Sequence, residues 1–129
     1  MSSTSPDQLK IKLQIFCGDE IAMGPGKADL LDAIAREGSI SAAGRALGMS
    51  YRRAWLLVDA MNRCWDEPLV TTAPGGRRGG GAQVTATGQA VLAGYRAVQA
   101  RLGLTARGHQ GEALLARLRP TPKQRQHQD

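Results

Sequence analysis

The sequence predicts a mainly α fold with small β hairpins, an α+β class in which short strands flank a helical core. Three observations support this prediction. Apolar residues recur at helical spacing over residues 27–37, 39–65 and 85–102. Two pairs of short β-prone runs lie beside these segments, and glycine- or proline-bearing stretches separate them. Short strands around three or more helices indicate one small domain.

The N-terminal part of this domain is predicted to be a hairpin followed by a helix. Residues 10–16 alternate polar and apolar side chains, which is the period of a half-buried strand. Residues 18–20 can turn the chain and residues 21–23 can pair back. Pro25 precedes a predicted helix over residues 27–37. The buried residues of this helix are expected to be Leu30, Leu31 and Ile34.

Residues 39–65 predict two helices joined by a tight turn. Gly48 permits the positive φ that such a turn needs, and Ser39 and Ser50 are suited to cap the two helices. One apolar face of the first helix comprises Ile40, Ala43 and Leu47. The matching face of the second comprises Ala54, Leu57, Val58, Met61 and Cys64. The two faces can bury against each other, as in a helix-turn-helix.

The second of these helices begins with polar and basic residues. Tyr51, Arg52 and Arg53 follow the capping Ser50 and include no carboxylate. The helix dipole places partial positive charge at this end, so an anion is its natural partner. The pattern favours a recognition helix with its N-terminus against nucleic acid, and the alternative is a packing unit with a solvated basic face.

A second hairpin is predicted directly after the helix-turn-helix. Residues 69–72 and 82–85 are short β-prone runs, and the glycine-rich tip between them carries Arg77 and Arg78. This arrangement predicts a winged helix-turn-helix in which the two arginines contact the DNA backbone. A nucleotide-binding phosphate loop does not fit, because the stretch lacks the required lysine, the following Ser or Thr and the flanking helix.

A further helix is predicted from about residue 85 to residue 102. Its apolar residues at steps of four, three and four are Val91, Tyr95, Val98 and Leu102. This spacing is that of a coiled-coil seam, so the helix either mediates homodimerisation or packs back on the core. A dimer would place two recognition helices about 34 Å apart and require a palindromic DNA site.

The sequence therefore predicts a winged helix-turn-helix domain over residues 10–102, including the dimerisation helix. Residues 1–9 are expected to be a disordered N-terminus. Residues 103–129 are expected to hold a glycine-broken short helix, over residues 112–119, and a disordered polar tail.

Composition narrows the function classes. The 17 Lys and Arg residues outnumber the 11 Asp and Glu residues, and the resulting formal charge of +6 favours polyanionic partners. Cys17 and Cys64 lack paired spacing, so both are expected to be reduced thiols without a disulfide or zinc site. His109 and His127 have no ligand-spaced neighbours, and no nucleophile accompanies a base, so no metal, cofactor or catalysis is expected. A cytoplasmic location is expected, since no signal peptide or membrane span is apparent.

Two longer segments resemble the DNA-binding domain of the ModE family of molybdate-responsive regulators, a branch of the LysR-like winged helices. They are GPGKADLLDAIAREGSISAAGRALGMSYRRAWLLVDAMN and PGGRRGGGAQVTATGQAVL. The resemblance covers roughly residues 10–102 and implies a sequence-specific regulator of molybdenum-related genes. It implies that Tyr51, Arg52 and Arg53 contact the groove or phosphates. Ser41 and Arg45 are further candidates for phosphate contacts, and a solvated position is the alternative for Arg45. Trp55 is expected in the core in preference to the sugar-phosphate edge.

The resemblance stops where family members carry β-barrel domains that hold the oxyanion. Residues 103–129 are too few to form such barrels, so no oxyanion site is carried over. The chain is then either part of a longer protein or a regulator that acts alone, and an effector-sensing partner protein could supply its signal. One alternative is a protein-binding module anchored by Tyr51 and Trp55. Another is an oxyanion-binding protein that uses helix N-termini and wing amides.

Overall fold

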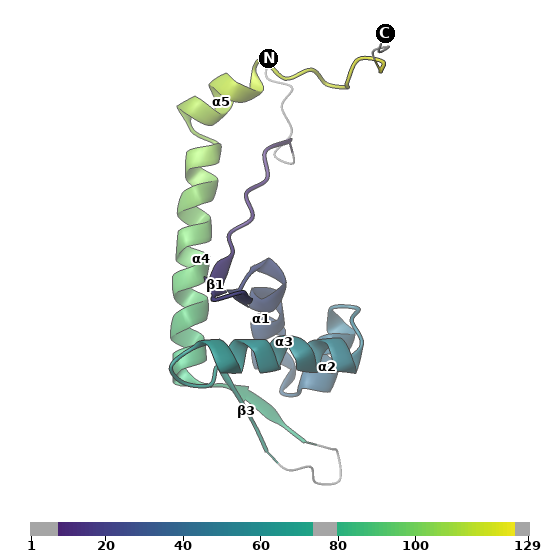
Figure 1. Cartoon of the computed structure of the whole chain (residues 1–129), viewed down its shortest axis with the longest axis vertical. Helices are drawn as coiled ribbons and strands as arrows, with labels where there is room; N and C mark the ends of the chain where they lie inside the picture. The colour runs from purple at the N-terminus through teal and green to yellow at the C-terminus, as the bar shows by residue number, and fades with distance from the viewer. Residues whose placement is uncertain (1–7, 74–79, 126–129) are drawn as a thin grey trace. The chain divides into compact units, whose positions relative to one another are not determined.

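The structure is a computed structural model that describes residues 8–73 and 80–125 (Figure 1). Contacts divide the chain into two compact units. One unit spans residues 12–99 and contains the helix-turn-helix and both hairpins. The other is formed from the two ends of the chain, beginning at residue 100 on the C-terminal side.

The N-terminal hairpin pairs strand β1 (Ile15–Cys17) with strand β2 (Glu20–Met23) in antiparallel fashion. Gly18 turns the chain with a φ of 60°, a conformation that favours glycine. The predicted hairpin is confirmed, but its first strand begins at Ile15 and not at residue 10. The partner strand has only four residues, and the register shifts between Ile15 and Phe16. The preceding residues therefore extend past the end of β2.

Three helices follow, namely α1 (Pro25–Glu37), α2 (Ile40–Ala46) and α3 (Tyr51–Cys64). Ser39 caps α2 and Ser50 caps α3, as predicted. Each hydroxyl oxygen accepts a backbone N–H of the first helical turn, at 3.0 and 3.1 Å. The predicted helix-turn-helix is thus confirmed, and Figure 1 shows α2 and α3 side by side.

The apolar faces of these helices form one core. Its largest fully buried side chains are Met23, Leu30, Leu31, Ile34, Val58, Met61 and Leu69. Leu47 was expected in this core, yet it is 37% exposed. α2 ends at Ala46, so Leu47 lies where the chain leaves the helix toward Gly48, whose φ is 71°. A residue beyond the last helical turn no longer follows the apolar face of the helix.

The second hairpin, the wing, pairs β3 (Val70–Thr72) with β4 (Ala82–Val84), with Val70 opposite Val84. Its strands confirm the predicted runs. The amide of Ala82 donates to the carbonyl of Gly38 at 2.8 Å, which attaches β4 to the end of α1. The wing is therefore fixed to the helical core at its base.

Asn62 of α3 holds the other strand of the wing. Its side-chain oxygen accepts the amides of Leu69 and Val70 at 2.8 and 3.1 Å, and its side-chain nitrogen donates to the carbonyl of Val70 at 3.0 Å. One amide side chain thus satisfies three backbone groups of the neighbouring segment. This contact connects the third helix directly to the wing.

The last two helices are α4 (Ala86–Ala106) and α5 (His109–Leu115). α4 continues four residues beyond the predicted end, through Gly103. A glycine inside a helix costs only about 1 kcal/mol, which does not end a helix by itself. The short helix was predicted over residues 112–119, but it begins at His109 and ends at Leu115. Gly108 separates α4 from α5. The helical segment is therefore interrupted at Gly108 and not at Gly103.

Candidate nucleic-acid interface

The N-terminus of α3 presents a basic, solvent-exposed first turn. Tyr51, Arg52 and Arg53 are all exposed, whereas Ala54 behind them is fully buried. The Ser50 cap leaves the remaining first-turn amides available, and the helix dipole adds positive potential at the same end. The turn therefore combines two full positive charges with a helix N-terminus, which suits a phosphate or the acceptor edge of a base.

Tyr51 and Trp55 form an aromatic pair on this exposed surface. Their rings meet edge to face, with centroids 6.5 Å apart and planes at 80°. The indole N–H of Trp55 donates to the hydroxyl of Tyr51. The core position expected for Trp55 is wrong, since the residue is 37% exposed. Ala54 and Val58 define the buried face of α3, so Trp55, next to Ala54 in the sequence, points away from the core.

Helix α2 contributes a polar pair one turn apart. The guanidinium of Arg45 donates to the hydroxyl of Ser41 at 2.8 Å, and Arg45 is exposed. The Ser41 hydroxyl retains its own proton as a donor while it accepts this bond. The pair can therefore offer several N–H and O–H donors to one phosphate group.

Ser41, Arg45, Tyr51 and Trp55 line one groove between α2, the start of α3 and the base of the wing. The groove has a volume of about 470 Å³. Its lining side chains from the helices are Ser39, Ile40, Ser41, Arg45, Tyr51 and Trp55. The wing contributes Thr72, Ala73, Gly80, Gly81 and Ala82. None of these described residues is acidic, so the groove suits an anionic or polar ligand. No pattern in the sequence indicates a groove shared by these three elements.

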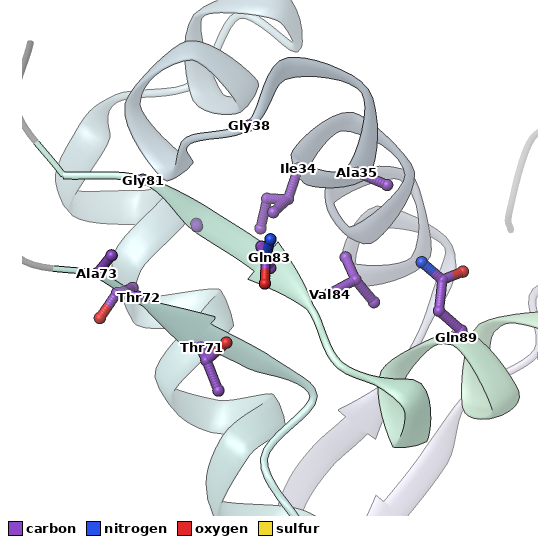
Figure 2. Close-up of a pocket in the computed structure, with 11 residues that line it drawn as sticks. Ile34, Ala35, Gly38, Thr71, Thr72, Ala73, Gly81, Gln83, Val84 and Gln89 are labelled. Carbon is purple, nitrogen blue, oxygen red and sulfur yellow. The ribbon is translucent and has the colours of Figure 1, made fainter.

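A second hollow lies between α1, the wing strands and the first turn of α4 (Figure 2). Its volume is about 740 Å³. Figure 2 shows Gln83 of β4 near Ile34 and Val84, and Gln89 farther along on α4. None of the described residues that line it is charged. The larger hollow therefore lacks the cations that a phosphate backbone requires, and the smaller groove is the better nucleic-acid candidate.

The helix-turn-helix and wing also match a known family of sequences. Residues 27–89 match the family described as "Bacterial regulatory helix-turn-helix protein, lysR family". Residues 27–89 belong to this LysR-type family. The matched segment begins in α1 and ends in the first turn of α4, so it includes every described residue of the groove.

Named relatives are similar to more than half of this chain. The molybdenum-pterin-binding protein MopB of Rhodobacter capsulatus is 51% identical over 78 residues, which cover 60% of this chain and 29% of MopB. The DNA-binding transcriptional dual regulator ModE of Escherichia coli K12 is 36% identical over 88 residues, which cover 68% of this chain and 34% of ModE. The chain thus spans about a third of the length of these curated relatives.

A solved structure has the same fold as the LysR-type domain. It is described as the crystal structure of a CbnR_DBD–DNA complex. The superposition has a TM-score of 0.53 and covers 71% of this chain and 97% of the other. Sequence identity is 22%, so this likeness shows the fold and leaves the roles of single residues open.

Three groups of predicted site residues are not assembled in this groove. Ser50, Arg52 and Arg53, at the start of α3, are not among its lining residues. Arg77 and Arg78 of the LysR-type wing lie outside the described residues. The four residues of the predicted dimer seam on α4 differ in their exposure. Tyr95 is only 3% exposed and its hydroxyl donates to the carbonyl of Leu13 at 2.7 Å, so it belongs to the core of its own chain. Val91 and Leu102 are half-buried, and Val98 is 47% exposed.

The described segments hold few other features that suggest a site. Within residues 8–73 and 80–125, His, Cys, Asp and Glu form no group of three or more that could hold a metal ion. No helix in these same segments is long and apolar enough to cross a membrane.

Proposed function

We propose that the chain binds duplex DNA as a sequence-specific transcriptional regulator, with the first turn of α3 in the major groove. The observation that carries this proposal is the exposed Tyr51-Arg52-Arg53 turn beside the groove lined by α2 and the wing. Arg52 or Arg53 can pair with two acceptors of a guanine, and the Ser41–Arg45 pair can bind a phosphate. Arg77 and Arg78 are proposed to contact the flanking backbone.

The regulated genes are proposed to be related to molybdenum. The support comes from the relatives, whose names refer to molybdenum transport, to molybdenum-pterin binding and to the regulator ModE. We infer cytoplasmic action, since DNA is the proposed partner. An effector-sensing partner protein is proposed to supply the signal.

A homodimer on a palindromic site completes the proposal. Val98 is an exposed apolar residue on α4, and Val91 and Leu102 lie on the same predicted seam. The seam would place two copies of α3 about 34 Å apart on one face of DNA. Tyr95 is omitted from this seam because it already packs in its own chain.

Selection of bound fragments from random-sequence duplex DNA tests the proposal. We expect the wild-type chain to enrich a palindrome and the double variant Arg52→Ala, Arg53→Ala to enrich none. The matched control is Arg101→Ala with Arg107→Ala, which removes two charges from residues outside the 12–99 unit. We expect this control to enrich the same palindrome. Failure of the wild type to enrich any sequence would contradict sequence-specific binding.

The wing arginines give a second, separable prediction. In Arg77→Ala with Arg78→Ala we expect weaker binding to all sequences alike, because phosphate contacts carry no sequence information. The slope of log binding constant against log salt concentration should fall by about one for each lost contact. Titrations of operator and scrambled duplexes at several salt concentrations measure this slope. A loss confined to the operator would contradict a backbone role.

One alternative has its own support in the structure. The exposed Tyr51–Trp55 pair has the composition of an anchor for a protein partner. A winged-helix protein-binding module would show binding to DNA that is absent or insensitive to salt. The same titrations therefore separate the two functions.

A further inference from the structure

Two thiols that are far apart in the sequence meet in the folded chain. Cys17 ends β1 and Cys64 ends α3, and neither forms a disulfide. Cys17 is exposed and Cys64 is half-buried. Both residues lie in the unit that spans residues 12–99. The positions of the two residues in the sequence do not indicate this proximity. It follows from the way the N-terminal hairpin packs on α3.

Contacts on both sides of Cys64 fix that packing. The guanidinium of Arg63 donates to a carboxylate oxygen of Glu20 at 2.8 Å. The indole N–H of Trp65 donates to the carbonyl of Ala22 at 3.1 Å. Because Cys64 lies between Arg63 and Trp65, these two bonds hold it against the hairpin. Cys17 pairs with Glu20 in the hairpin register, so it lies at the same place.

The bonds of Arg63 and Trp65 to the hairpin bring the Cys64 thiol near the Cys17 thiol. Partial burial raises the pKa of the Cys64 thiol, and a hydrogen bond with Cys17 raises it further, while Arg63 opposes both effects. Cys17 is thus the accessible sulfur, and Cys64 lies within reach behind it.

We propose that Cys17 and Cys64 are a redox-active thiol pair, which a hydroperoxide converts into an intramolecular disulfide. The Cys17 thiolate attacks a peroxide oxygen, the O–O bond breaks, and Cys17 becomes a sulfenic acid as one water leaves. The Cys64 sulfur then attacks the Cys17 sulfur, the S–O bond breaks, and a second water leaves. Two thiols and one hydrogen peroxide thereby give one disulfide and two waters.

The bond would close a covalent loop around the helix-turn-helix. It would join the first hairpin to the C-terminal end of α3, and α1, α2 and α3 would all lie between the two joined residues. A loop of this size strongly restricts the unfolded chain. The oxidised chain should therefore melt at a temperature higher by on the order of 10 °C.

The test treats the full chain with hydrogen peroxide, blocks free thiols with iodoacetamide, and maps tryptic peptides without reduction. We expect peptides 13–27 and 64–77 to be joined, with the loss of two hydrogen atoms, in a chain that remains monomeric by mass. Dithiothreitol should separate them and reverse the rise in melting temperature. Oxidation that stops at Cys17 with Cys64 still alkylated, or disulfides formed only between chains, overturns the proposal.

The matched control is a variant in which one thiol is moved to the neighbouring residue of β1. Phe16 precedes Cys17 on β1, is 59% exposed, and points to the opposite face of the strand. Phe16→Cys in a Cys17→Ser chain keeps two thiols and full reagent access while it moves one thiol away from Cys64. We expect this variant to form no intramolecular disulfide under the same treatment. Equal crosslinking in the control would show that chain mobility, and not the folded arrangement, joins the thiols.

Discussion

Gly88→Ala is expected to lower the free energy of unfolding by at least about 3 kcal/mol. Gly88 is buried in the first turn of α4, which packs against the start of the wing. A Cβ at this position would lie 2.3 Å from the carbonyl oxygen of Leu69 and 2.7 Å from a methyl carbon of Val84. The Leu69 carbonyl is backbone, and it already accepts the amide of Thr85 at 2.9 Å. Relief of the clash therefore requires the helix and the wing to separate.

Urea unfolding of the full chain, followed by circular dichroism, measures this loss. The control is Gly94→Ala, in the same helix, where an added Cβ meets no atom within 4 Å. Alanine is the better helix former, so Gly94→Ala should raise stability by up to about 1 kcal/mol. Similar effects of the two substitutions would show that the approach of α4 to the wing is looser than the structure shows.

Asn62→Leu is expected to lower the free energy of unfolding by about 3 kcal/mol. Leucine has the same branching as asparagine but makes none of its three hydrogen bonds to Leu69 and to Val70, the first residue of β3. The substitution leaves the amides of Leu69 and Val70 without their acceptor in a half-buried region. Unpaired backbone groups of this kind carry most of the cost of such a change.

Asn62→Asp tests separately the accepting oxygen and the donating nitrogen of the Asn62 side chain, in the same experiment. The carboxylate retains an oxygen for the two amides but cannot donate to the carbonyl of Val70. We expect a loss of stability clearly smaller than that of Asn62→Leu when both are unfolded in urea at neutral pH. An aspartate variant as unstable as the leucine variant would contradict the dominant role assigned to the two accepted bonds.

Local features of the fold could be predicted from the sequence. Ser39 and Ser50 cap their helices because a hydroxyl before an apolar repeat has one favourable local partner. Gly48 takes the positive φ that the turn requires. The two hairpins likewise follow from β-prone runs and turn residues that are neighbours in the sequence. Each of these signals lies within a few residues of the structure it determines.

Features that depend on distant residues could not be predicted. Tyr95 fits a coiled-coil spacing as well as it fits the core, and only its bond to Leu13 decides between them. The contact between Cys17 and Cys64 needs the hairpin to pack on α3. These cases share one cause, since tertiary packing chooses among locally equivalent arrangements.

The attachment of the wing at its base bears on how such a domain can diverge. β3 is held by Asn62 and β4 by Gly38, and the amide of Ala73 donates to the carbonyl of Gly81 at 2.9 Å across the hairpin. All of these anchors lie outside the segment from Pro74 to Gly79. Mutations, insertions and deletions in that segment can therefore accumulate without loss of any anchor, and new contact preferences can evolve on an unchanged scaffold.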